Sequence, residues 1–183
     1  MPQESFVATI NRDKECTLAG PATLEGTSLH TGEKVTLTIK PASVGHGFKF
    51  RRIDLPDQPL IEADVARVEK VERATTLASG SVRVHTVEHV LSALSGMGVD
   101  NALIEMDANE PPIGDGSARP FVELIKKAGL EEQDQRLKTW EIREPLHFDN
   151  KNGSHITIVP LPRVPRVRHQ PEQGRKVHPA FLD

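Results

Sequence analysis

The chain has 183 residues, 27% of them charged, and a formal net charge of −3. This balance excludes the basic surface typical of nucleic-acid-binding proteins, so we expect no nucleic-acid partner. Only 4% of the residues are aromatic, so aliphatic side chains must fill a core no larger than one domain or one domain and part of another. Cys16 is the single cysteine, and no apolar run approaches the ~20 residues that span a bilayer. We therefore expect a cytoplasmic protein with no stable membrane anchor; the oligomeric state stays open.

The first third of the chain is expected to contribute strands. Residues 1–16 are polar and lack the apolar core of a signal peptide, which favours a leader outside the fold. Residues 35–39 alternate apolar side chains with threonine, the pattern of a half-buried strand. Residues 48–50 predict a second strand with both phenylalanine rings on one face. Further short strands are predicted over residues 60–66, 82–84 and 101–106.

Two helices are predicted in the middle of the chain. Apolar residues recur at i, i+3, i+4, i+7 and i+10 from Val87 to Met97, which places one apolar stripe against a core. Thr86 is a plausible N-cap of this helix. Pro120 stands at an N1 position and predicts a second helix through Lys127, ended by Gly129.

This order of elements predicts an α+β fold in which a layered sheet packs against helices. We expect one domain over residues 17–129 and a charged, apolar-poor linker over 130–138. Residues 139–142 and 156–159 are candidate strands that open a second, incomplete domain over 139–159. Residues 160–183 carry repeated proline and arginine and no regular apolar period, so we expect no packed structure there. A disordered basic tail and a stretch foreign to the fold are both compatible with this composition.

Glu88 and His89 are the candidate reactive residues. They lie about 100° and 200° around the helix from Val87, outside the apolar stripe, so packing does not explain them. Imidazole is a common zinc ligand, and carboxylate is a common general base for metal-bound water. On this dipeptide alone a surface histidine would be the preferred interpretation.

Five ordered segments reverse that preference. They are residues 28–32 (SLHTG), 50–55 (FRRIDL), 86–94 (TVEHVLSAL), 100–105 (DNALIE) and 112–122 (PIGDGSARPFV). Together they resemble the N-terminal half of the UDP-3-O-acyl-N-acetylglucosamine deacetylases, the zinc amidases of lipid A synthesis in Gram-negative bacteria. The resemblance runs from about residue 17 to about residue 159. It implies that the first domain is similar to a ribosomal S5 domain 2-like fold.

The resemblance implies zinc as cofactor and UDP-3-O-acyl-N-acetylglucosamine as small-molecule substrate. Glu88 matches the general base, and His89 matches a zinc ligand. Three further residues are candidates for substrate binding, each with a plainer alternative. His30 could line the cleft or cap a turn, Thr76 could end a strand, and Asp115 could bond local backbone N–H groups in an Asx-turn. The family usually has a bulky apolar residue at the position of Gly114.

The remaining zinc ligands of the family are a histidine and an aspartate spaced i, i+4. No histidine of this chain is followed four residues later by aspartate or glutamate. One imidazole holds zinc weakly, because a catalytic site needs three protein ligands. We therefore expect a deacetylase by lineage that is incomplete and inactive by itself. The alternative is a non-catalytic domain of the same family that binds a nucleotide-sugar or a partner.

Overall fold

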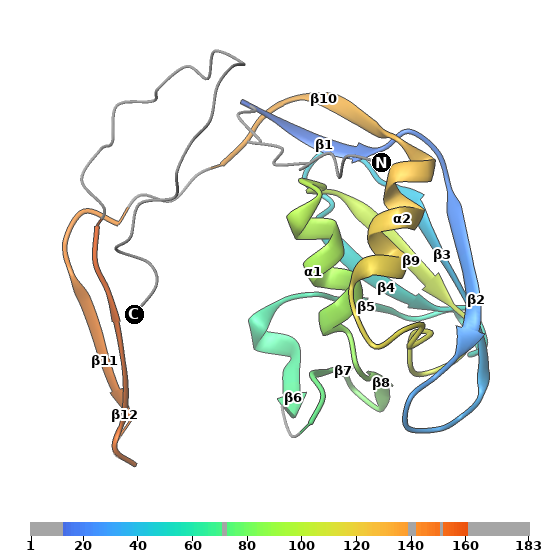
Figure 1. The fold of residues 1–183 in the computed structure, drawn as a ribbon, viewed down its shortest axis with the longest axis horizontal. Helices are drawn as coiled ribbons and strands as arrows, with labels where there is room; N and C mark the ends of the chain where they lie inside the picture. The colour runs from blue at the N-terminus through green and yellow to red at the C-terminus, as the bar shows by residue number, and fades with distance from the viewer. Residues whose placement is uncertain (1–12, 71–72, 139–141, 151, 161–183) are drawn as a thin grey trace, which may run out of the picture. The chain divides into compact units, whose positions relative to one another are not determined.

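The computed structural model describes residues 13–70, 73–138, 142–150 and 152–160. The chain divides into a first unit that ends at Leu137 and a second unit that begins at Lys138. The first unit combines sheets with two helices, so the predicted α+β layered fold is confirmed (Figure 1). Within the described residues, no helix has the length and apolar character needed to cross a membrane.

A five-stranded sheet forms the centre of the first unit, in the order β2-β3-β9-β4-β5. Strands β4 and β9 are parallel, and the other neighbours are antiparallel. The strands are β2 (Ala22–Thr27), β3 (Lys34–Pro41), β4 (Phe48–Arg52), β5 (Leu60–Glu62) and β9 (Ala102–Met106). The predicted strands 35–39, 48–50 and 101–106 therefore correspond to the three inner strands.

One face of this sheet and the two helices form the core. In β3 the side chains of Val35, Leu37 and Ile39 are buried, as their alternation with threonine predicts. Helices α1 (Glu88–Gly96) and α2 (Arg119–Ala128) lie over one face of the sheet (Figure 1). Each large aliphatic or aromatic side chain that becomes fully buried contributes about 1.5–3 kcal/mol.

A smaller three-stranded antiparallel sheet precedes α1. It consists of β6 (Val68–Lys70), β7 (Thr76–Ser79) and β8 (Val82–Val84), in that order. The strand predicted over 60–66 is shorter than expected, because β5 ends at Glu62 and residues Val65–Arg67 form a 3-10 turn. Asp64 caps this turn by accepting a hydrogen bond from the backbone N–H of Ala66 at 2.8 Å.

Parts of the segments interpreted as a leader and a linker, residues 14–16 and 130–136, belong to paired strands. β1 (Lys14–Leu18) and β10 (Leu130–Arg136) are antiparallel, and the backbone N–H of Leu137 continues the pairing by donating to the carbonyl of Asp13 at 2.9 Å. The strand β10 was not predicted, because it is largely exposed and carries no apolar alternation. Residues 1–12 lie outside the described residues.

The side chain of Asn101 ties this pair of strands to the central sheet. Its Oδ1 accepts from the backbone N–H of Gly47 at 2.8 Å. Its Nδ2 donates to Oε2 of Glu15 in β1 and to Oε1 of Gln133 in β10, both at 2.8 Å. The hydroxyl of Thr17 donates to the Asn101 carbonyl at 2.7 Å. These bonds satisfy polar groups that are buried together at the end of the sheet.

The second unit contains one antiparallel hairpin in its described part. Strands β11 (Leu146–Asn150) and β12 (Ser154–Ile158) are joined through a turn in which Gly153 has a φ of 86°. The predicted strand 156–159 overlaps β12, whereas β11 was not predicted. Of the predicted strand 139–142, residues 139–141 lie outside the described residues and Ile142 is not in a strand. The tail beyond residue 160 also lies outside the description.

We expect Asn101→Ala to lower the free energy of unfolding by roughly 2–3 kcal/mol, because it removes hydrogen bonds to partly or fully buried groups of Gly47, Glu15 and Gln133. Urea denaturation followed by circular dichroism measures this change. Asn152→Ala is the matched control, since Asn152 is exposed in the hairpin turn, and it should change stability little. Equal effects of the two substitutions would contradict the role of Asn101.

Candidate active site

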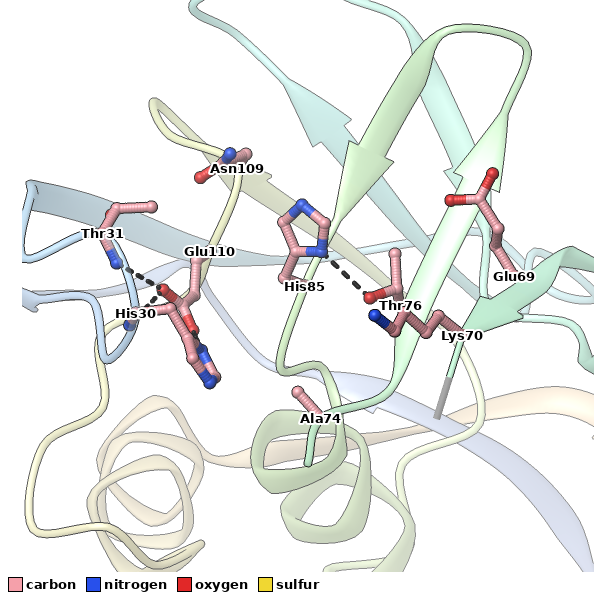
Figure 2. Close-up of a pocket in the computed structure, with 9 residues that line it drawn as sticks. All are labelled: His30, Thr31, Glu69, Lys70, Ala74, Thr76, His85, Asn109 and Glu110. Atoms are coloured by element: carbon pink, nitrogen blue, oxygen red, sulfur yellow. Dashed lines mark hydrogen bonds and ion pairs between the residues drawn. The ribbon is translucent and has the colours of Figure 1, made fainter. Parts of the chain in front are cut away.

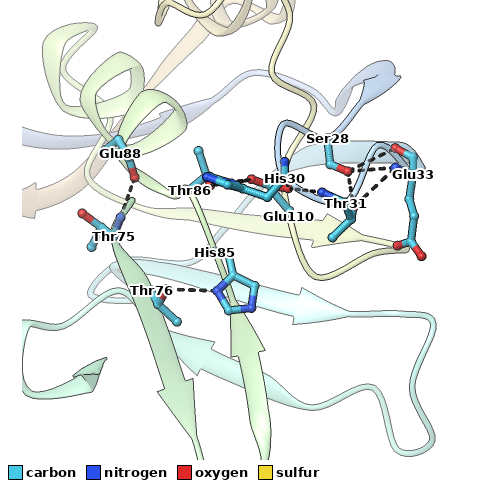
Figure 3. A network of polar contacts seen from close by, with 10 residues as sticks. All are labelled: Ser28, His30, Thr31, Glu33, Thr75, Thr76, His85, Thr86, Glu88 and Glu110. Atoms are coloured by element: carbon cyan, nitrogen blue, oxygen red, sulfur yellow. Dashed lines mark hydrogen bonds and ion pairs between the residues drawn. The ribbon is translucent and has the colours of Figure 1, made fainter. Parts of the chain in front are cut away.

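The first turn of α1 carries both candidate reactive residues. Glu88 and His89 are half-buried, whereas Val90 and Leu94 on the same helix are completely buried. The expected separation between the reactive pair and the apolar stripe is therefore present. Oε2 of Glu88 accepts a hydrogen bond from the backbone N–H of Thr75 at 3.1 Å (Figure 3). This contact joins the first helical turn to the segment that leads into β7.

Thr86 does not cap α1, contrary to the sequence-based prediction. The N-cap residue is Val87, which makes no side-chain capping bond. Thr86 has a φ of 53°, in the left-handed region that β-branched residues avoid. Its hydroxyl instead donates to Oε1 of Glu110 at 2.5 Å. Thr86 therefore makes a tertiary contact in place of a local cap.

Glu110 is fully buried and accepts hydrogen bonds from two other segments of the chain. Its Oε1 contacts Nδ1 of His30 at 2.7 Å in addition to the hydroxyl of Thr86. Its Oε2 accepts from the backbone N–H groups of His30 at 2.9 Å and Thr31 at 3.4 Å (Figure 3). One carboxylate thus connects the loop around His30 with Thr86, the residue before the N-cap of α1.

The hydrogen bonds determine the ionisation of Glu110. Burial opposes the charged form of this carboxyl group and would raise its pKa. The bonds from the Thr86 hydroxyl, the His30 ring and the backbone of His30 and Thr31 together outweigh burial and hold the pKa below its ordinary value. Glu110 is therefore an anion at neutral pH.

A pocket of about 330 Å³ lies beside this network (Figure 2). Two of the candidate substrate-binding residues, His30 and Thr76, line it, but Asp115, Glu88 and His89 do not. The lining residues are His30, Thr31, Glu69, Lys70, Ala74, Thr76, His85, Asn109 and Glu110. Glu88 nevertheless lies near the pocket, because its hydrogen-bond partner Thr75 directly precedes Thr76, which lines the pocket.

Several functional candidates in this pocket were missed by the sequence analysis. Nδ1 of His85 lies 2.9 Å from the hydroxyl of Thr76, which is the first residue of β7. Oδ1 of Asn109 is buried and has no hydrogen-bond partner within the described residues. His85 could have been suspected, because it adjoins the motif at residues 86–89 and follows buried Val84 in an alternating strand. Glu110 offered no such signal, since its partners are distant in sequence.

Asp115 makes the local contacts of an Asx-turn. Its Oδ1 accepts from the backbone N–H of Ser117 at 3.0 Å and from the Ser117 hydroxyl at 2.7 Å. The side chain is exposed, and the Ser117 hydroxyl, as the main cause, lowers its pKa. The local contacts of an Asx-turn are therefore present at Asp115, and its role in substrate binding stays a prediction.

Gly114 lies in the same loop, at a position where the backbone conformation favours glycine. Its φ is 56°, and a Cβ built there would lie 2.8 Å from Cγ of Pro120. A side chain at this position would therefore be strained by its backbone and obstructed by the proline ring. The loop therefore favours glycine at position 114, where the family that the sequence resembles usually has a bulky apolar residue.

His89 supports metal binding only as a single suitable ligand. A half-buried imidazole at a helix start is a chemically suitable zinc ligand. Within the described ranges, however, no group of three or more histidine, cysteine, aspartate or glutamate side chains is arranged to hold a metal ion. The described residues therefore fit one ligand position and not a complete centre.

Comparison with known proteins places these features in a family. The family model for UDP-3-O-acyl N-acetylglycosamine deacetylase matches residues 15–172. A UDP-3-O-acyl-N-acetylglucosamine deacetylase from Methylococcus capsulatus is 46% identical over 92% of this chain and 54% of its own length. A deacetylase of the same name from Pseudomonas entomophila is 53% identical over 81% of this chain and 48% of its own length. One from Saccharophagus degradans is 49% identical over 77% and 46%, respectively.

The chain therefore belongs to the UDP-3-O-acyl N-acetylglycosamine deacetylase family. It spans about half the length of the curated relatives that it matches. The match continues past residue 159 to residue 172, so it includes part of the segment that the sequence indicated to be a tail. The roles of Glu88 and His89 stay predictions at this point.

We expect Glu110→Gln to destabilise the protein by roughly 1–3 kcal/mol at neutral pH, because charged hydrogen bonds are lost from a buried site. The depressed pKa of Glu110 means that its contribution is fully present above the ordinary value of 4.5 and is lost as the pH falls through the lower folded value. The difference between wild type and variant should thus shrink below about pH 4.5.

Urea denaturation at several pH values measures that difference. Glu131→Gln is the control, because Glu131 is exposed in β10. A gap between wild type and Glu110→Gln that stays constant down to pH 3 would contradict an ionised, hydrogen-bonded Glu110.

A pair of glycine substitutions tests the loop at Asp115. Gly116→Ala should cost about 1–2 kcal/mol, because Gly116 has a φ of 79° but open space around it. Gly114→Ala should cost more, since it adds the close approach to Pro120. Thermal unfolding of both variants measures the two costs. Equal melting temperatures would show that Pro120 does not restrict this position.

Proposed function

We propose that the chain takes part in zinc-dependent hydrolysis of the acetamide of UDP-3-O-acyl-N-acetylglucosamine, which releases acetate in lipid A biosynthesis. Family membership supports this proposal. The single observation that carries it is the placement of Glu88 and His89 together in the first turn of α1, outside the buried stripe and next to the segment that lines the pocket. We place the reaction in the cytoplasm.

In this proposal Glu88 is the general base. Its carboxylate accepts a proton from the water that attacks the acetamide carbonyl. That proton then passes to the amide nitrogen as the carbon–nitrogen bond breaks, which gives acetate and a free amine. The hydrogen bond from the Thr75 N–H orients the carboxylate before substrate arrives. His30 and Thr76 are proposed to contact the substrate, because both line the pocket.

His89 would supply one imidazole ligand to zinc. A bound zinc ion would polarise the carbonyl and the attacking water. The other ligands would come from outside the described residues, as the family resemblance implies. The alternative is a non-catalytic domain that binds a nucleotide-sugar or a partner. It is favoured by one observation, the lack of a three-ligand group within the described residues.

Deacetylation of a 3-O-acylated UDP-N-acetylglucosamine tests the proposal. We would measure acetate release by this chain with zinc, with and without the C-terminal half of the Methylococcus capsulatus relative added as a separate polypeptide. Glu88→Gln should reduce turnover by about 10²–10⁴-fold, the range expected for loss of a general base. Glu123→Gln, on an exposed position of α2, is the matched control. No turnover in either mixture would favour the non-catalytic domain.

His89→Ala should abolish zinc binding in the same complemented mixture while leaving the circular dichroism spectrum unchanged. The fold should survive because His89 is half-buried and is not one of the core residues of α1. Isothermal titration with zinc measures the first effect. His155→Ala, in the exposed part of β12, should leave zinc binding as in wild type. Unfolding of His89→Ala would contradict the assigned placement.

A further inference from the structure

We infer that Glu110 is a positioning residue for the reaction. Its carboxylate holds Thr86 in the left-handed backbone conformation from which α1 starts, and thereby sets the position of Glu88. This inference rests on the proposed function, because Glu110 would affect the reaction only by positioning Glu88, the proposed base. It adds a residue that acts without touching the reacting atoms.

The first step of the argument is the conformation of Thr86. The described residues include four non-glycine positions with positive φ: Asp57, Gln58, Arg73 and Thr86. The first three are exposed, and Thr86 alone among them is buried and β-branched. Such a residue remains in the left-handed region only when its surroundings determine the conformation. Some contact of Thr86 must therefore offset the strain.

The second step is the identity of that contact. The Thr86 hydroxyl lies 2.5 Å from Oε1 of Glu110, and both side chains are buried. Glu110 is itself fixed, because His30 and Thr31 direct backbone N–H groups at Oε2 and the His30 ring contacts Oε1. The carboxylate is thus an acceptor that the donors of the loop around His30 hold in place. Figure 3 shows this chain of contacts.

The third step leads from Thr86 to Glu88. The backbone N–H of Val87 approaches the carbonyl of Thr75 at 3.4 Å, and the N–H of Thr75 donates to Oε2 of Glu88 at 3.1 Å. Both contacts lie within two residues of Thr86. A change of φ at Thr86 to the ordinary negative region would swing the first turn of α1 and break the bond between Thr75 and Glu88. The Thr75 amide therefore reports whether Glu110 positions the base.

Amide hydrogen exchange measured by NMR on this chain tests the inference. Thr86→Val keeps the shape of the side chain and removes the hydroxyl, so exchange of the Thr75 amide should accelerate by roughly tenfold or more. Glu110→Gln should have a similar effect. The NH₂ group of the new glutamine must face either the Thr86 hydroxyl or the N–H donors of the His30 loop, so this side chain cannot accept hydrogen bonds from both. Amides of β10 are the internal control, because no residue of this strand takes part in the network.

A glycine rescue separates positioning from plain stabilisation. Glycine adopts positive φ without strain, so Thr86→Gly alone should leave the Thr75 amide protected. In the double variant Glu110→Gln, Thr86→Gly, protection of Thr75 should return toward the wild-type level even though the buried carboxylate is gone. A role of Glu110 limited to anchoring its own loop predicts no such rescue.

Two results would overturn the inference: unchanged Thr75 exchange in Thr86→Val, or loss of Thr75 protection in Glu110→Gln that glycine at position 86 does not restore. Should Glu110→Gln fail to fold, the Thr86→Val and Thr86→Gly pair decides the question. In the complemented turnover assay, Thr86→Val should lower kcat with little change in KM. Absence of turnover in wild type would reject the proposed function, whereas the exchange result stands independently of it.

Discussion

Burial of the Glu110 carboxylate is the constraint on which the arrangement of the site depends. An ionised carboxylate removed from water must receive hydrogen bonds, or its desolvation would destabilise the fold by several kcal/mol. Glu110 obtains them from the His30 loop and from Thr86, so these two segments cannot move independently. The wall of the pocket and the start of α1 are therefore both held by hydrogen bonds to the buried Glu110 carboxylate.

Regular elements with strong periodicity were predictable from the sequence. The alternation in β3 and the apolar stripe of α1 each bury one face, and burial of apolar area is the dominant local signal. β10 and β11 were not predictable, because all but one of their side chains are exposed and no period distinguishes them from loops. The buried amide of Asn101 contacts both β10 and its partner β1, and these contacts join residues far apart in the chain.

The candidate site was predictable only where a motif carried it. Glu88 and His89 stand side by side in a helix pattern, and His30 lies in a glycine-marked loop, so residue type and spacing identified them. The sequence also indicated Thr86 as an N-cap, because threonine commonly serves that purpose. Tertiary bonding to Glu110 overrode this local preference. Glu110 could not be found from spacing, since the fold alone brings it to His30 and Thr86.

Pairing of β1 with β10 has a consequence for how the first unit is assembled. The carbonyl of Asp13 and the N–H of Leu137 meet at 2.9 Å, so the first described residue of this unit and its last residue are neighbours in space. Nearly the whole unit must therefore leave the ribosome before β1 can pair with β10. Loop-closure entropy opposes this pairing. The same adjacency suits a circular permutant of residues 13–137, in which a short Gly/Ser peptide joins Leu137 to Asp13 and new termini open in the exposed turn at residues 56–58.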